Sequence, residues 1–96
     1  MNQQITIVAD TSVALKPLLE SAIRTELKML ELGLERTRQR LLAFEERFSM
    51  TSADFEQRYT QGNIAESLDF IEWWGEIKTY ALLNAQQQAL AGAYLN

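Results

Sequence analysis

The sequence predicts an all-α protein: an elongated antiparallel helical hairpin with a short helix connecting its two long ones. Apolar residues recur at helical spacing over two segments, and the single proline, Pro17, stands at the start of the first. A helix covering residues 17–48 would be roughly 48 Å long, whereas a compact chain of this length has a radius of gyration of about 12–13 Å. Two such helices fit only side by side, in an elongated molecule.

The first long helix is expected at residues 17–48, where Gly33 is the only helix-breaking residue after Pro17, which suits the first turn. Apolar residues repeat along it at spacings of three and four, with Thr37 as the one polar member. We call this line the leucine seam: Ile23, Leu27, Leu30, Leu34, Thr37, Leu41, Phe44 and Phe48. Two helices alone cannot cover the seam and the aromatic residues that follow it. We therefore expect two copies to pair into a four-helix bundle, with residues 23–44 of the seam as the dimer contact.

The connector, "FSMTSADFEQRYTQGN", is predicted to be a short helix at residues 51–61 rather than a loop. Thr51 suits an N-cap, and Asp54 three residues later resembles a capping box. Met50 and Phe55 flank that cap at the spacing of a hydrophobic staple. Gly62 is placed to end the helix in a left-handed conformation.

The last helix is expected at residues 67–94, capped by Ser67, with fraying near Gly92. Residues 1–12, which include "QITIVA", are predicted to form a short extended arm. All of these elements are assigned to one domain, residues 1–96. The apolar face of the last helix is expected to centre on Phe70, Trp74, Ile77, Ala81 and Ala85, with Trp73 and Tyr80 on one shoulder.

Composition argues against most catalytic chemistry. The chain has no cysteine and no histidine, so it lacks thiolate nucleophiles, the common zinc ligands and the usual neutral-pH base. We expect no enzyme, no cofactor and no metal. The net charge of −4 disfavours broad binding to nucleic acid. With no signal peptide and no bilayer-spanning segment evident, the sequence predicts a cytoplasmic protein that does not enter the membrane.

Candidate contact residues gather around the connector. The simplest interpretation is that the aromatic residues plug one end of the hairpin; the alternative is that some of them dock a partner. We expect Tyr59, Trp73 and Tyr80 to face outward. Asp69, Glu72 and Glu76 share a helix face, which is either a solvated surface or an electrostatic surface for a basic partner. A strip of arginines beside the seam suggests salt bridges between helices, with phosphate contact as the alternative: Arg36, Arg40 and Arg47.

The stretch "LLAFEERFSMTSADFEQRYTQGN…DFIEWWGEIKTY" resembles a group of small helical proteins common in cyanobacteria and archaea. The resemblance covers about residues 20–82. Two features depart from the group's pattern: Ser49, where glycine is usual, and the less acidic "NIAES". Many members are encoded beside a small toxin gene and are regarded as candidate antitoxins. The positions that match are Phe44, Glu45, Phe48, Met50, Ser52, Phe55, Tyr59, Gly62, Asp69, Phe70, Glu72 and Trp73.

The resemblance implies an antitoxin-like interaction module that neutralises a small toxin by masking its surface. The expected contacts are Tyr59, Asp69, Glu72, Trp73, Glu76 and Tyr80, and the expected partners are a second copy and a toxin encoded nearby. One alternative is a self-contained structural dimer without a toxin. A second alternative is a weak nucleic-acid-binding regulator that uses the arm and the arginine strip.

Overall fold

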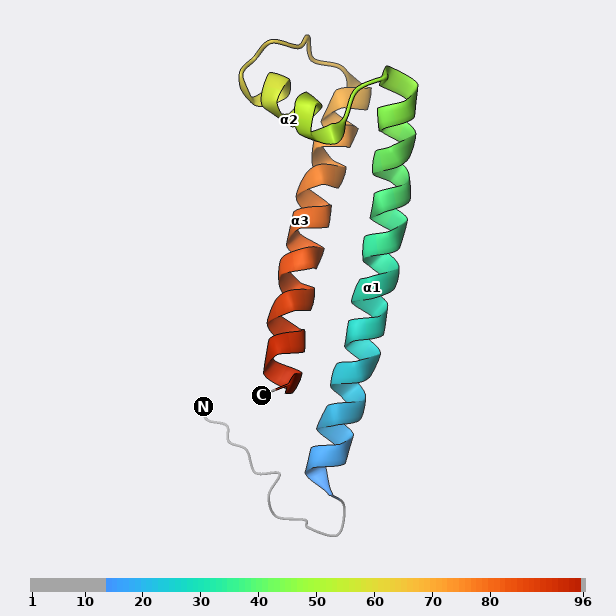
Figure 1. The fold of residues 1–96 in the computed structure, drawn as a ribbon, viewed down its shortest axis with the longest axis vertical. Helices are drawn as coiled ribbons and strands as arrows, with labels where there is room; N and C mark the ends of the chain where they lie inside the picture. Colours follow the sequence, from blue (N-terminus) through green and yellow to red (C-terminus); the bar gives the residue numbers. More distant parts are fainter. Residues whose placement is uncertain (1–13, 96) are drawn as a thin grey trace.

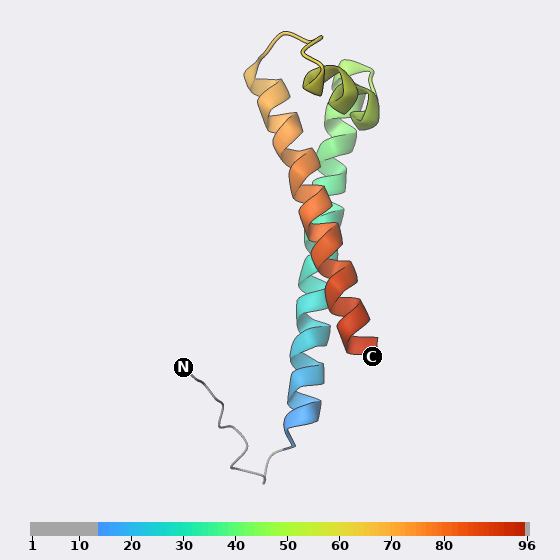
Figure 2. The ribbon, with the colours of Figure 1, turned by 90° about the vertical axis from the view of Figure 1, so that its left-hand side faces the viewer.

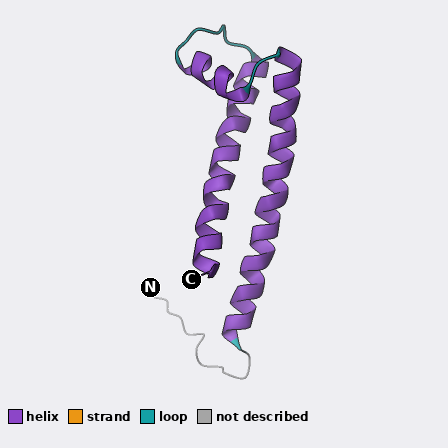
Figure 3. Ribbon diagram, in the orientation of Figure 1, coloured by secondary structure: helices purple, strands orange, loops and turns teal. Residues whose placement is uncertain are grey.

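The computed structural model describes residues 14–95 of the 96 and shows three helices in that range: α1 (Leu15–Phe48), α2 (Ser52–Thr60) and α3 (Leu68–Leu95). The two long helices run antiparallel and side by side, and α2 lies across one end (Figure 1; Figure 3). The radius of gyration is 19.5 Å and the longest dimension is 60 Å. The predicted elongated hairpin with a short connecting helix is therefore confirmed. The predicted arm at residues 1–12 lies outside the described residues.

Helix α1 begins at Leu15, two residues before the predicted start, and continues without interruption to Phe48. Pro17 lies in its first turn, where its missing N–H costs no hydrogen bond. Gly33 lies where α3 comes close, because a Cβ built there would be 3.3 Å from Cδ1 of Leu83. The one glycine within α1 therefore makes room for a leucine of the opposite helix.

The chain leaves α1 through a left-handed residue. Ser49 has a φ of 50°, and the next amide, Met50 N–H, donates to the Glu45 carbonyl at 3.2 Å. This is the hydrogen bond of a Schellman-type helix end, a position that glycine fills at the lowest steric cost. Serine at this position therefore carries a steric cost that glycine would avoid.

Both predicted caps of α2 are confirmed. The Asp54 N–H donates to Thr51 Oγ1 at 3.0 Å, so Thr51 is the N-cap. At the other end Gly62 has a φ of 73°, and the Asn63 N–H donates to the Arg58 carbonyl at 2.9 Å. This second Schellman-type end turns the chain toward α3.

Helix α3 begins as predicted, since the Phe70 N–H donates to Ser67 Oγ at 3.1 Å. It continues through Gly92 to Leu95, so the helix does not end at the glycine where fraying was expected. The face that packs on α1 is also rotated from the predicted one. Ala81 and Ala85 are exposed, and the side chains turned toward α1 include Trp73, Ile77, Tyr80 and Leu83.

The long helices cross at a shallow angle rather than running strictly parallel (Figure 2). Arg47 pairs with Asp69 near α2, Arg40 with Glu76 farther along, and Gly33 lies against Leu83 near the middle. In this register the C-terminal end of α3 stops short of the N-terminal end of α1, so the first residues of α1 extend past α3 (Figure 1). We call this end of the hairpin the open end, and the end that carries α2 the corner.

Candidate interaction surfaces

The corner is built around Trp73. Its ring stacks on Phe55, with centroids 4.0 Å apart and planes 2° from parallel, and on Phe44 at 5.5 Å. Neither Trp73 nor Phe55 has any exposed surface. Trp73 Nε1 donates to Ser52 Oγ at 2.9 Å, and the Ser52 N–H donates to Glu45 Oε2 at 2.8 Å. These contacts join all three helices, as the end-plug interpretation predicted.

The expectation that Trp73 faces outward is wrong. Apolar residues occur almost all around the first turns of α3, so periodicity alone does not select its buried face. The short helix α2 selects it by bringing Phe55 over one side of α3. Trp73 therefore takes the centre of the corner, and a side chain without exposed surface offers nothing to a partner.

Tyr59 and Tyr80 are each half-buried. The Tyr59 ring lies 5.1 Å from Phe55 and 5.5 Å from Trp74, on the outer side of the corner. A hydrogen bond from the Tyr59 hydroxyl to the Glu66 carboxylate raises the pKa of Tyr59 above its ordinary 10.0. Only part of each tyrosine is open to contact, so these two are minor candidates.

The three acidic candidates do not form one solvated face. The two terminal guanidinium nitrogens of Arg47 reach Asp69: Nη1 lies 3.2 Å from Oδ1 and Nη2 lies 3.0 Å from Oδ2. Arg40 Nη1 lies 3.6 Å from Glu76 Oε2, and the Glu76 side chain is only 20% exposed. Asp69 and Glu76 are half-buried in these ion pairs, whereas Glu72, which lines the same groove between α1 and α3, is exposed. Salt bridging between the helices is thus confirmed for Arg40 and Arg47, and the acidic surface for a partner shrinks to Glu72.

These acidic groups also do not form a metal site. Among the described residues, no three His, Cys, Asp or Glu side chains are grouped so that they could hold an ion. The buried Oε1 of Glu76 has no hydrogen-bond partner, an arrangement that costs stability. Glu76 therefore acts as a poorly satisfied member of the helix interface.

The leucine seam packs against other residues of the same chain. Leu30 and Thr37 are buried, and its other members are half-buried against α3 and the corner. Two of them show the partners directly: Phe44 stacks on Trp73, and Leu27 lines a groove with Gln87 and Ala91. The seam was predicted to be the dimer contact. Since α3 already covers it, a dimer would need another face of the hairpin.

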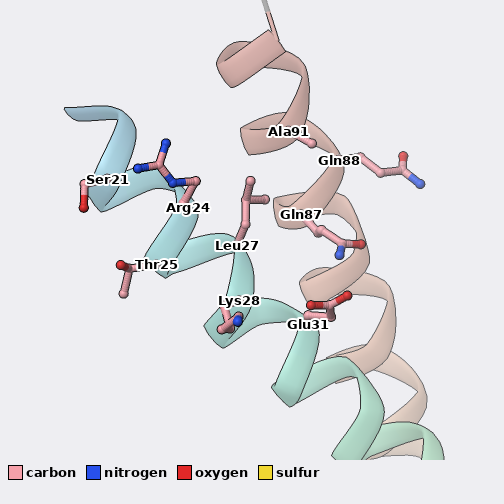
Figure 4. A pocket seen from close by; sticks show the side chains of 9 residues that line it. All are labelled: Ser21, Arg24, Thr25, Leu27, Lys28, Glu31, Gln87, Gln88 and Ala91. Carbon is pink, nitrogen blue, oxygen red and sulfur yellow. The ribbon is translucent and has the colours of Figure 1, made fainter. Parts of the chain in front are cut away.

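The open end is thinly filled. Leu27 lies on the side of α1 that faces α3 and lines a groove with Gln87 and Ala91, while the Gln88 side chain points away (Figure 4). On another side of the same helix pair, a groove of about 390 Å³ is lined by Glu26, Leu30, Gln86, Ala89 and Leu90. We call it the Leu30 groove. Short alanine and polar glutamine side chains cannot fill this end as the aromatic rings fill the corner.

A second apolar line on α1 lies about a third of a turn from the leucine seam. Its spacings are three and four, and every member is exposed. Its four large side chains are between 46% and 59% exposed, and covering each would contribute about 1 kcal/mol. We call it the outer stripe: Leu15, Leu18, Ala22, Thr25, Met29 and Leu32. The sequence pattern does not single out this stripe, because the longer leucine seam dominates the periodicity of the helix.

Helix α3 also carries exposed apolar residues on its outer side. Leu68 is 84% exposed, and Ile71 and Leu82 are about half exposed. Their spacing places them on one side of the helix, with Gly75 between them. We call these three residues the α3 patch.

No family model, curated protein or solved structure matches this chain. Across residues 14–95, neither long helix has a stretch apolar enough to cross a membrane.

Proposed function

We propose that this chain is a protein-interaction module that acts as the antitoxin-like partner of a small toxin. The proposal that the partner is a toxin rests on the family resemblance. The observation that supports an interaction role is the set of large apolar side chains on outward faces of both long helices. Monomeric proteins seldom leave extended apolar patches uncovered, and such patches mark binding surfaces.

The α3 patch is the surface proposed for the toxin. Leu68, Ile71 and Leu82 offer apolar contact. The exposed carboxylate of Glu72 follows Ile71 in the sequence and lines the neighbouring groove with Arg40 and Arg47. A basic partner would gain from that charge and from the net charge of −4. Tyr59 and Tyr80 contribute only their exposed edges. Binding would block the toxin sterically.

The chain is also proposed to form a homodimer. The core of one hairpin is small: among the described residues only Leu30, Thr37, Phe55 and Trp73 are buried. Chains of about 100 residues bury a modest share of their surface and gain stability by sharing a core. A self-contained dimer without a toxin is the alternative function, and it predicts that the chain works independently of any neighbour.

Co-expression with the protein encoded next door tests the antitoxin role. The natural chain should restore growth that the neighbour alone arrests. Ile71→Glu and Leu82→Glu should abolish that rescue, because each places a charge in the α3 patch. Gln88→Glu, an exposed change on the same helix, is the matched control and should rescue fully. A harmless neighbour, or growth arrest that persists with the natural chain, would show that the antitoxin role is wrong.

A further inference from the structure

The outer stripe has a symmetric order of side-chain sizes. Read along α1 it runs large, large, small, small, large, large, with Ala22 and Thr25 at its centre. Reversing the direction leaves this order unchanged. A two-fold antiparallel contact pairs each residue with the one at the mirrored position of the other copy, and this order then places large side chains against large ones and small against small.

We propose that a second copy of this chain covers the outer stripe, with the two α1 helices antiparallel around a two-fold axis between Ala22 and Thr25. In this register Leu15 packs on the partner's Leu32, and Leu18 on the partner's Met29. Ala22 meets the partner's Thr25 at the axis, where small side chains let the helices approach closely. The inference rests on the homodimer proposed above and is independent of the toxin.

The residues that flank the stripe are compatible with this antiparallel pairing. On one edge Leu19 meets the partner's Glu26, and on the other Ser21 meets the partner's Lys28. No like charges are brought together. The stripe itself carries no charged residue, so the negative net charge of the chain does not oppose the contact locally.

A parallel pairing is disfavoured by the residues that continue the line beyond Leu32. The same spacing leads to Arg36 and, farther along, to Glu46, both exposed. A parallel in-register pair would bring each of these residues against its own copy, and like charges at a helix contact are destabilising. The antiparallel pairing ends before Arg36 and avoids both contacts.

The antiparallel register also supplies an occupant for the Leu30 groove. Glu26 lies on its rim, and Leu30, Ala89 and Leu90 give it an apolar lining. Leu19, which is 53% exposed in one hairpin, faces Glu26 across the pair and would enter the groove. The two open ends then cover each other, with a corner at each far end of the dimer.

Cysteine cross-linking tests the register, since the natural chain has no cysteine. A mixture of the Leu18→Cys and Met29→Cys variants should form a disulfide-linked dimer at least about tenfold more readily than either variant alone. Two copies of Leu18 lie about 16 Å apart along the antiparallel pair, too far for a disulfide. Efficient cross-linking of Leu18→Cys alone would instead indicate a parallel pair and overturn the register.

Light scattering tests whether the outer stripe is the face through which two copies bind. The natural chain should have the mass of a dimer at about 50 µM, and Met29→Glu should raise the dissociation constant at least about 30-fold. Leu42→Glu is the matched control, because Leu42 is a 44% exposed leucine of α1 outside the stripe. Circular dichroism should show that both variants keep their helices. Dissociation by Leu42→Glu and not by Met29→Glu would overturn the choice of face.

The outcomes separate the proposals. A dimeric mass with the wrong cross-linking pattern overturns the register and leaves the dimer. A monomeric mass of the natural chain overturns the dimer together with this inference. Neither result bears on toxin neutralisation, which the growth assay reads independently.

Discussion

At the corner, Trp73 and Phe55 stack 4.0 Å apart with no exposed surface, whereas at the open end Leu27 meets Gln87 and Ala91 across a groove. The same two helices form both ends. The corner has a third helix and aromatic rings that bury one another, and the groove beside Phe44 is lined by the two ion pairs between α1 and α3. The open end has short or polar side chains on α3 and exposed leucines on α1. The difference indicates that the corner is completed within one chain, whereas the open end leaves apolar surface exposed, which is where we propose that a second copy binds.

Removing Trp73 should produce the largest effect on this contrast. Trp73→Ala deletes the central ring of the corner and its hydrogen bond to Ser52, so we expect a loss of about 3–5 kcal/mol in the free energy of unfolding. The adjacent Trp74 is half exposed and provides the matched control. Trp74→Ala should cost less than half as much in urea unfolding followed by circular dichroism. Equal losses would show that the corner has no special role.

Hydrogen exchange should separate the two ends directly. Local contacts limit opening, so amides of α1 around Phe44 should exchange about 100-fold more slowly than amides around Leu27 in dilute protein. Protection around Leu27 should then rise with protein concentration, because the proposed second copy would cover the open end. The measurement is amide exchange by mass spectrometry at two concentrations. Uniform, concentration-independent protection would contradict both the contrast and the proposed dimer.

A third change tests the corner at Ser49, the one described residue other than glycine that has a left-handed backbone conformation. Ser49 has a φ of 50°, so Ser49→Gly removes a steric cost and should raise the free energy of unfolding by about 0.5–1 kcal/mol. Ser67→Gly is the control, because Ser67 caps α3 through its hydroxyl and its loss should destabilise slightly. Thermal unfolding of both variants against the natural chain provides the measurement. A destabilised Ser49→Gly would contradict the argument.

The smallest expected effect is a pH dependence at the outer side of the corner. The hydrogen bond to Glu66 raises the pKa of Tyr59, so the folded state favours the neutral phenol. This contribution is complete below pH 10.0 and is lost as the pH rises through the raised pKa. The melting temperature of the natural chain relative to Tyr59→Phe should therefore be steady from pH 7 to 9 and should fall above pH 10. An unchanged difference above pH 10 would show that the bond does not contribute.

Much of the fold follows from local sequence signals. These signals depend on residues close together in the chain, and the structure confirms them. They are the helical spacing of the leucine seam, the caps at Thr51 and Ser67, and the left-handed conformation of Gly62. The candidate site was predicted less well. Trp73 is buried, and Asp69 and Glu76 pair with arginines that lie 22 and 36 positions earlier. Such contacts depend on how α3 is rotated, and local periodicity does not fix that rotation.

By itself the sequence determined two long helices and a capped short helix that turns the chain between them. Helix caps and heptad spacing act over a few residues, so they can be recognised before any packing is known. The tertiary structure decided which side of α3 is buried, and with it which aromatic and acidic residues remain accessible. It also showed that the leucine seam is covered by α3 and that a second, symmetric stripe on α1 is left exposed. The physical reason is that exposure depends on the neighbours of a helix face as well as on its composition.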